Sequence, residues 1–219
     1  MRQADLFIGL PFIVTSLIMS RLKPVFFLSV LLLSSFGFIA NPLPPVKWVI
    51  SSAYFLKVAG STNVNKFACV ITDYSTPDTL ICYRNKTGAP LKLSGRLQLE
   101  VQDFDCQNAI MTKDLRKTLK AKDFPVLTIR FLSLNRYPDL KKKSDEIKGI
   151  VLIGLAGVTK QYEVDYKFIP GDAGSLNLTG SRQINFSDFN IVPPRKIGGM
   201  IRTNNELNVE FNLKMRVLD

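Results

Sequence analysis

The chain has 219 residues, of which 46% are hydrophobic, and it carries a formal net charge of +11 without a single histidine. The lack of histidine excludes Ser-His-Asp triads, histidine metal ligands and the usual proton shuttle. The basic residues form no dense block interleaved with aromatic residues, so the sequence predicts no nucleic-acid partner. Two interpretations of the charge stay open: solvated outer faces, or a peripheral contact with anionic membranes.

Two apolar runs at the start of the chain predict a targeting segment. They cover residues 6–18 and 25–40, and the basic residues Arg21 and Lys23 lie between them. Basic residues ahead of an apolar stretch that ends in small residues are typical of a secretory signal peptide. Each run is shorter than the ~20 residues of a membrane-spanning helix, although two short membrane helices are an alternative.

The targeting segment also sets the domain boundary. We expect a signal segment over residues 1–40, with Met19 as the working start, followed by one domain over residues 41–219. No cysteine directly follows the second apolar run, so lipid attachment at a new N-terminus is not indicated. The protein should therefore be periplasmic or secreted.

Apolar and polar residues alternate along most of the remaining chain, as in strands with one buried and one solvated face. The longest run, residues 206–217, places six apolar side chains from Leu207 to Val217 on one face. Other runs cover residues 95–104, 125–131 and 161–168, with shorter or less regular ones at 67–71, 79–83, 148–158 and 176–180. About eight strands without a βαβ rhythm predict an all-β protein, and we favour a closed antiparallel barrel.

One segment breaks the period of two. Residues 106–122 place Met111, Leu115 and Leu119 at i, i+4 and i+8, which is the stripe of an amphipathic helix. This helix should end before Pro125. The charged run at residues 139–148 is predicted to be a hairpin tip.

A strand-like run before the C-terminal strand stops at two consecutive prolines, which cannot donate to a ladder. Ile184 and Phe186 are spaced to share one face of this strand. We expect Asp188 and Asn190 to tie the strand end through side-chain hydrogen bonds. Phe189 would lie near the rim of a cavity or pack in an ordinary core.

Three cysteines, Cys69, Cys82 and Cys106, fit one disulfide and one free thiol in an exported chain. Cys69 and Cys82 are symmetric about the loop at residues 73–78 and could face each other across a hairpin. Pairing Cys69 with Cys106 would close a longer loop, which stabilises more in the chain-entropy model. Strand pairing alone leaves both alternatives open.

Four segments resemble the YceI-like family of exported bacterial proteins that bind polyisoprenoid and other lipids. They are STNVNKF at residues 61–67, the strand–helix–FP run at 99–131, GLAGVTKQYEV at 154–164 and INFSDFNIVPP at 184–194. The resemblance spans most of residues 47–216. It implies a lipocalin-like barrel with an apolar tunnel for one long chain, and it favours a Cys69–Cys106 disulfide. Many relatives carry a histidine near the first segment, and this chain has none.

The inward faces of the expected strands, read with this resemblance, define a candidate tunnel lining. Its residues are Leu99, Val101, Ile129, Phe131, Tyr162, Tyr166, Phe168, Ile184, Phe186, Phe189, Val209, Phe211, Leu213 and Met215. The same residues would form a dry core if the barrel closed tightly, so ordinary packing is the alternative for each. Tyr162 and Tyr166 are the best candidates for polar contacts, because a buried phenol needs a hydrogen-bond partner.

Binding is favoured over catalysis. Asp103 and Asp105 are two residues apart and could act as paired carboxylates, but nothing in the sequence orients them. Cys106 has no histidine base to activate it as a nucleophile. We therefore expect no catalytic residue, metal or cofactor, and a lipid or isoprenoid ligand held for storage or transport in the cell envelope. A dry barrel that acts through protein contacts is the alternative, and a homodimer stays open.

The first prediction concerns export. We expect the mature chain to begin after a cut between Gly37 and Asn41, because Arg21 and Lys23 precede the apolar run at residues 25–40. N-terminal sequencing of the protein from its native host checks this. A cytoplasmic protein that starts at Met1 or Met19 would contradict it.

Overall fold

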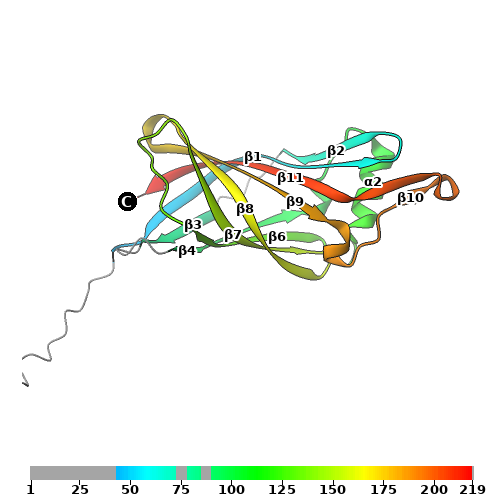
Figure 1. Cartoon of the computed structure of the whole chain (residues 1–219), viewed down its shortest axis with the longest axis horizontal. Helices are drawn as coiled ribbons and strands as arrows, with labels where there is room; N and C mark the ends of the chain where they lie inside the picture. The colour runs from blue at the N-terminus through cyan, green and yellow to red at the C-terminus, as the bar shows by residue number, and fades with distance from the viewer. Residues whose placement is uncertain (1–42, 73–77, 85–89, 219) are drawn as a thin grey trace, which may run out of the picture. The chain divides into compact units, whose positions relative to one another are not determined.

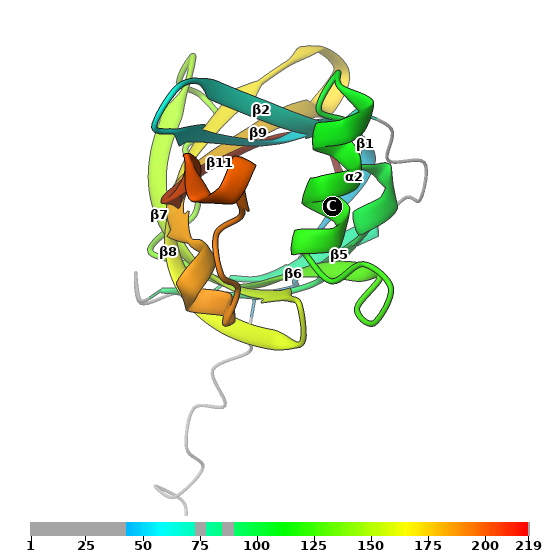
Figure 2. The same ribbon diagram turned by 90° about the vertical axis from the view of Figure 1, so that its right-hand side faces the viewer.

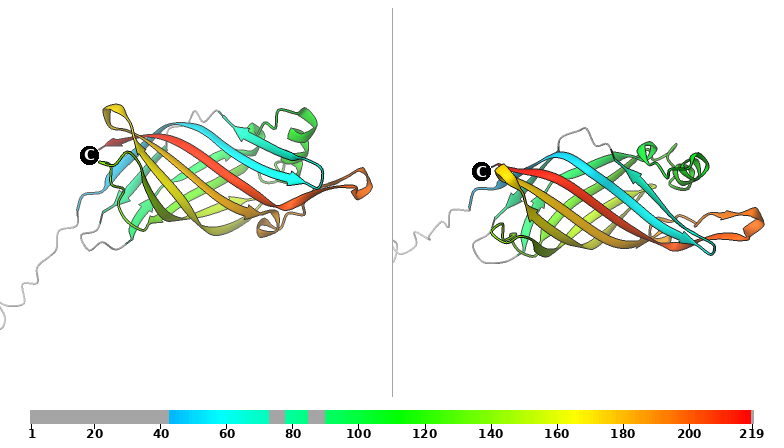
Figure 3. Two further views of the ribbon diagram at one scale, coloured as in Figure 1. Left: turned by 45° about the horizontal axis from the view of Figure 1, so that its top comes forward. Right: turned by 90° about the horizontal axis from the view of Figure 1, so that it is seen from above.

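Eight antiparallel strands form a closed ring in the computed structural model, which describes residues 43–72, 78–84 and 90–218. The ring runs β1–β11–β9–β8–β7–β6–β4–β3 and returns to β1, because β1 pairs with both β3 and β11. All of these strands belong to the compact unit Pro42–Asp219. The strands wind around the barrel axis with β1, β11 and β9 side by side (Figures 1 and 3). The fold is thus the all-β antiparallel barrel that the sequence predicts.

The ring strands differ greatly in length. They are β1 (Val46–Thr62), β3 (Asp78–Tyr83), β4 (Leu91–Ser94), β6 (Val126–Leu134), β7 (Asp145–Leu155), β8 (Val158–Pro170), β9 (Ser175–Asn185) and β11 (Ile201–Leu218). Three further strands outside the ring extend the sheet: β2 (Lys66–Ile71), β5 (Arg96–Glu100) and β10 (Arg195–Lys196). The described part of the chain has one α-helix, α2 (Ala109–Thr118), and four 3-10 turns, η1 (Val101–Asp103), η2 (Asp172–Gly174), η3 (Phe186–Phe189) and η4 (Ile197–Gly199).

Two strands of the barrel, β1 and β6, each change their hydrogen-bonding partner along their length. β1 pairs with β3 through its first residues and with β2 from Leu56 onwards. β6 pairs likewise with β5 near its start and with β4 near its end. In the described residues, β2 and β5 do not pair with each other; one bridge joins Val70 of β2 to Asp105, which follows β5 and η1, and the two residues exchange two backbone hydrogen bonds of 2.8 Å. Helix α2 lies beside this interruption (Figure 2), so we call this end of the barrel the α2 end.

Some element boundaries differ from the sequence-based expectations. β1 and β4 lie outside the predicted strands, and the register of β1 against β11 shifts three times, which breaks the alternation that marks a strand. β5 ends at Glu100, and Val101 is buried in the turn that follows. The helix is shorter than residues 106–122, and residues 145–148 of the expected hairpin tip belong to β7.

The end of β9 is held mainly by one carboxylate. Asp188 Oδ2 accepts hydrogen bonds from the Asn185 backbone N–H at 2.9 Å and from the Tyr162 hydroxyl at 2.8 Å. Asn190 does not act through its side chain as expected; its backbone turns left-handed and its N–H donates to the Ser187 carbonyl at 3.2 Å. Phe189 is only 1% exposed and lies beside the Tyr162 ring, so it belongs to the core and not to the rim.

Aromatic side chains fill the half of the barrel away from α2. Ring centroids are 5.7 Å apart for Trp48 and Phe168, 6.3 Å for Phe168 and Tyr166, and 5.9 Å for Tyr166 and Phe211. Gly180 pairs with both Tyr166 and Phe211, and a Cβ atom there would collide with the Phe211 ring. The missing side chain leaves room for these rings, and we call this half the aromatic end.

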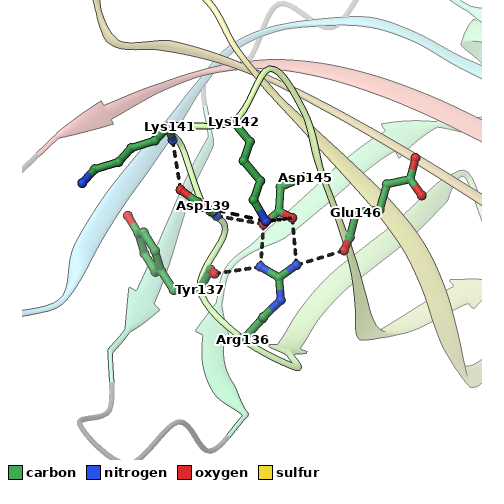
Figure 4. A network of polar contacts seen from close by, with 7 residues as sticks. All are labelled: Arg136, Tyr137, Asp139, Lys141, Lys142, Asp145 and Glu146. Carbon is green, nitrogen blue, oxygen red and sulfur yellow. Dashed lines mark hydrogen bonds and ion pairs between the residues drawn. The ribbon is translucent and has the colours of Figure 1, made fainter.

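A buried carboxylate fixes the β6–β7 loop at the aromatic end. Arg136 donates to both oxygens of Asp145 and to the carbonyls of Tyr137 and Glu146 (Figure 4). Asp145 also accepts from the Asp139 backbone N–H at 2.8 Å. The Arg136 hydrogen bonds, followed by the Asp139 N–H, hold the pKa of Asp145 well below its ordinary range.

We therefore expect Asp145→Asn to destabilise the fold by about 2 kcal/mol at neutral pH, because it removes charged hydrogen bonds from a buried site. A depressed carboxyl pKa contributes stability above the unfolded pKa and loses it as the pH falls. The difference between wild type and variant should therefore narrow below about pH 4. Urea unfolding at several pH values measures it, with Glu163→Gln in the exposed Lys148–Glu163 pair as the control that should change little. An Asp145→Asn protein as stable as wild type at pH 7 would contradict the prediction.

Candidate functional site

A small enclosed cavity lies inside the α2 half of the barrel. Its volume is about 40 Å³, and every lining residue is apolar. The lining consists of Leu56, Val58, Phe104, Leu115, Leu119, Leu127, Ile129, Ile153, Leu155, Ile184, Leu207 and Val209. A cavity lined in this way offers water no hydrogen-bond partner, so it favours hydrocarbon.

A larger cavity of about 340 Å³ opens at the α2 end. Its apolar surface comes mainly from Phe67, Ile110, Met111, Leu115, Phe186, Pro194 and Ile201. Polar side chains such as Asn65, Asn108 and Lys196 also line it. Leu115 belongs to both linings, so the two cavities adjoin at this side chain of α2. Leu115 separates the two cavities, and their linings together form an apolar region that extends from the surface into the barrel, which we call the apolar path below.

Local interactions fix α2 as a wall of this path. Asn108 caps the helix, and its side chain accepts a hydrogen bond from the Met111 N–H at 3.0 Å. Leu115 and Leu119 are buried, while Met111 is half-buried, so the predicted stripe points inward. Arg116 donates to the Phe104 carbonyl at 3.0 Å, which ties the outer side of the helix to the chain before it.

A disulfide joins the two sides of the interrupted wall. Cys69 on β2 is bonded to Cys106, just before α2, and their Cα atoms are 3.9 Å apart. Cys82 remains a buried thiol on β3. β2 and β3 pair with different halves of β1, with Cys69 opposite Val58 and Cys82 opposite Val46, so the alternative Cys69–Cys82 hairpin does not exist in this structure.

One ion pair crosses the mouth of the larger cavity. Lys196 Nζ of β10 lies 2.7 Å from Asp114 Oδ2 of α2, and both residues line the cavity. Their side chains are 49% and 30% exposed. Pairs this accessible contribute little to stability. The contact can therefore separate at small cost when α2 and the β10–β11 hairpin move apart.

The two tyrosines proposed for polar contacts have different surroundings. Tyr162 donates to Asp188, and burial together with this carboxylate raises the pKa of its hydroxyl. Its phenol thus supports the end of β9. Tyr166 is 2% exposed, burial raises its pKa, and its hydroxyl has no hydrogen-bond partner among the described residues. Its ring belongs to the aromatic end.

The predicted lining residues separate into groups along the barrel axis. Ile129, Ile184 and Val209 line the small cavity, and Phe186 lines the larger one. The remaining buried members lie in the core outside these two cavities: Leu99, Val101, Phe131, Tyr166, Phe168, Phe189, Phe211, Leu213 and Met215.

Several lining residues are missing from the sequence-based set. Leu56 and Val58 lie on β1, whose register shifts hide its strand pattern. Met111, Leu115 and Leu119 were visible as a helical stripe, but a stripe does not reveal which surface it covers. Leu127 and Leu207 share faces with Ile129 and Val209, so the period of two was the signal that could have added them.

The structure gives the catalytic alternatives no support. Asp105 accepts a hydrogen bond from the Gln107 N–H at 2.8 Å and forms the bridge with Val70, whereas Asp103 ends the turn η1, so the two carboxylates do not share a strand. The Cys106 sulfur is part of the disulfide. Within the described ranges, no three Cys, Asp or Glu side chains gather as a metal site, and no helix is both long and apolar enough to cross a membrane.

The described residues thus form a closed antiparallel barrel with one α-helix beside its apolar path. The family model described as "YceI-like domain" matches residues 48–215, and the chain belongs to this family. No curated protein matches the sequence.

Two solved structures share the fold at low identity. The polyisoprenoid binding domain from Saccharophagus degradans is 10% identical with a TM-score of 0.55, over 78% of this chain and 98% of that one. Burkholderia cenocepacia BcnA is 14% identical with a TM-score of 0.51, over 73% and 95% of the two chains.

We expect peptide mapping without reduction to recover a Cys69–Cys106 peptide. Cys82 should resist alkylation in the native protein, because burial raises the pKa of its thiol to about 11 and covers the sulfur. The same reagent should modify it rapidly in denaturant, which serves as the control. A Cys69–Cys82 peptide, or rapid native alkylation of Cys82, would contradict this arrangement.

Proposed function

We propose that the protein is an exported lipid-binding protein that holds a long apolar chain, polyisoprenoid or related, for storage or transport in the cell envelope. The observation that carries the proposal is the apolar path, which runs from the surface at α2 to the small cavity inside the barrel. Each buried CH₂ group contributes about 0.8 kcal/mol, so a chain of many carbons binds without polar contacts.

The geometry favours a flexible apolar ligand over a compact polar one. The small cavity holds about one water volume and offers no polar lining atom. The larger cavity, at about 340 Å³, is wide enough for several methylene or isoprene groups, and most of its lining surface is apolar. A ligand tail that reaches deeper must displace Leu115 and Leu119 of α2, whose only covalent tie to β2 is the disulfide beside its first turn.

The comparisons support this choice of ligand without fixing it. Membership of the YceI-like family and the shared fold with a polyisoprenoid binding domain both agree with an isoprenoid tail. A non-enzymatic role, a periplasmic or secreted location and a homodimer are parts of the same proposal. Mass spectrometry of lipid extracted from the purified protein would identify the ligand.

We expect Val209→Trp to abolish lipid co-purification while the protein stays folded, because Val209 lines the small cavity. Val217→Trp is the matched control, since Val217 is also a half-buried valine of β11 but lies at the aromatic end, opposite Trp48. Val217→Trp should lower the free energy of unfolding through overpacking by about 1–3 kcal/mol, as Val209→Trp should, but it should retain lipid.

Lipid content and melting temperature separate the two readings of the barrel interior. Melting must be compared on delipidated samples, since a bound ligand itself raises apparent stability. A wild-type protein that carries no lipid, with both variants merely less stable, would refute the carrier function and leave the dry-core alternative.

A further inference from the structure

Exposed apolar side chains gather at the α2 end, around the mouth of the larger cavity. Ile110 of α2 is 74% exposed, Met200 is 73% exposed, and Ile197 and Val64 are similarly exposed. Ile110 and Val64 also line the cavity. Figure 2 looks onto this end, where α2 and the β10–β11 hairpin stand on opposite sides of the ring. The apolar path therefore opens within an apolar rim.

The hairpin at residues 195–202 is built to hold two of these side chains in solvent. Gly198 and Gly199 have φ values of 61° and 93°, and a Cβ atom on either would meet nothing within 4 Å. Ile197 itself has a φ of 51°, which is rare and unfavourable for a β-branched residue. Strain of this kind points to a functional constraint on the tip.

The base of this hairpin is anchored. The Asn63 side chain donates to the Met200 carbonyl and accepts from the Arg202 N–H, both at 2.9 Å. Arg202 Nε donates to the Gly199 carbonyl at 3.0 Å. The tip thus keeps a defined shape while its apolar side chains have no protein surface to cover them.

Positive charge surrounds the apolar rim. The hairpin carries Arg195, Lys196 and Arg202, and no acidic residue occurs between Ile191 and Asn205. On α2, Ile110, Lys113 and Lys117 share one face at i, i+3 and i+7.

A surface groove of about 520 Å³ beside this face adds to the charge. It is lined by five basic side chains and one acidic residue, Asp123. In the described residues, no ion pair involves Lys113, Lys117 or Lys120. Asp114, the acidic residue of α2, is paired with Lys196.

We propose that the hairpin at residues 195–202 and the exposed face of α2 dock the barrel onto a bilayer surface that contains anionic lipid. Ile197, Met200 and Ile110 enter the boundary between headgroups and acyl chains, and the basic residues lie over lipid phosphates. The cavity mouth then faces the bilayer, so an apolar ligand passes between membrane and barrel without crossing water. Only this last consequence rests on the proposed function.

A tryptophan reporter tests the orientation directly. Trp48 is the single tryptophan of the chain and is fully buried, so a second one gives a local signal. Met200→Trp should shift its emission to the blue and be quenched by vesicles of phosphatidylcholine and phosphatidylglycerol with brominated acyl chains. Tyr83→Trp, at the exposed β3–β4 side of the aromatic end, should not be quenched. The full chain is used throughout, so residues 1–42 contribute equally to every sample.

Charge reversal tests the anionic component. Lys113→Glu, Lys117→Glu and Lys120→Glu combined should lower binding to these vesicles roughly a hundredfold or more, because each of the three cations contributes about 1 kcal/mol near the surface. Lys47→Glu, Lys92→Glu and Lys143→Glu combined change the net charge equally on exposed residues at the other end, and should bind more tightly than the first variant. Added salt should weaken wild-type binding.

The outcomes separate docking from ligand binding. Equal quenching of Met200→Trp and Tyr83→Trp, no quenching of Met200→Trp, or equal losses in the two charge variants would overturn the docking proposal and leave a second copy or a protein partner as the occupant of this surface. Quenching confined to Met200→Trp supports docking even if the wild-type protein carries no extractable lipid, a result that sinks only the proposed function.

Discussion

The barrel depends on a wall that backbone hydrogen bonds do not complete. β1 and β6 each pair with two partners along their length. In the described residues, their partners at the α2 end, β2 and β5, do not pair with each other, and the gap is crossed by a single bridge between Val70 of β2 and Asp105, beyond the end of β5. Side-chain packing of α2 and the Cys69–Cys106 bond close this gap. A strand ladder would have to lose several hydrogen bonds to open, whereas a packed helix can shift by exchanging one apolar contact for another. The apolar path lies where the barrel wall is closed by the packed helix α2 and not by a strand ladder.

The depth of the apolar path depends on how the sizes of the inward-pointing side chains vary along the barrel axis. At the aromatic end, the rings of Tyr166, Phe168 and Phe211 pack against one another, and the Phe211 ring lies over Gly180. At the α2 end, the small cavity is lined by aliphatic side chains and a single aromatic one, Phe104. Aromatic residues bury much area with little freedom, while leucines and valines yield more readily to a ligand. The inward-facing residues of the strands thus form a rigid core at the aromatic end and an adaptable pocket at the α2 end.

The sequence predicted the barrel better than the site, and particular residues show why. β8 and β11 alternate cleanly because, from Val164 and Leu207 onwards, each has one buried face and one solvated face. β1 was not predicted as a strand, because its register shifts move side chains from one face to the other within the strand. The residues around the cavity were only partly predicted, since Ile129 and Phe131 are equivalent by period but lie at different depths. Depth depends on which strands are neighbours, and a periodic pattern does not contain that information.

The pairing of β1 with β11 has a consequence for how the protein is made. Lys47 lies opposite Leu218 in that ladder, so the ring joins residues from nearly the two extremes of the described chain. The barrel cannot close until its last strand has been delivered, and until then β1 has an unpaired edge that can pair with other chains. Contacts of such long sequence separation form slowly. Under the proposed export, the chain would cross the membrane before folding and would become a barrel only after β11 had arrived on the far side.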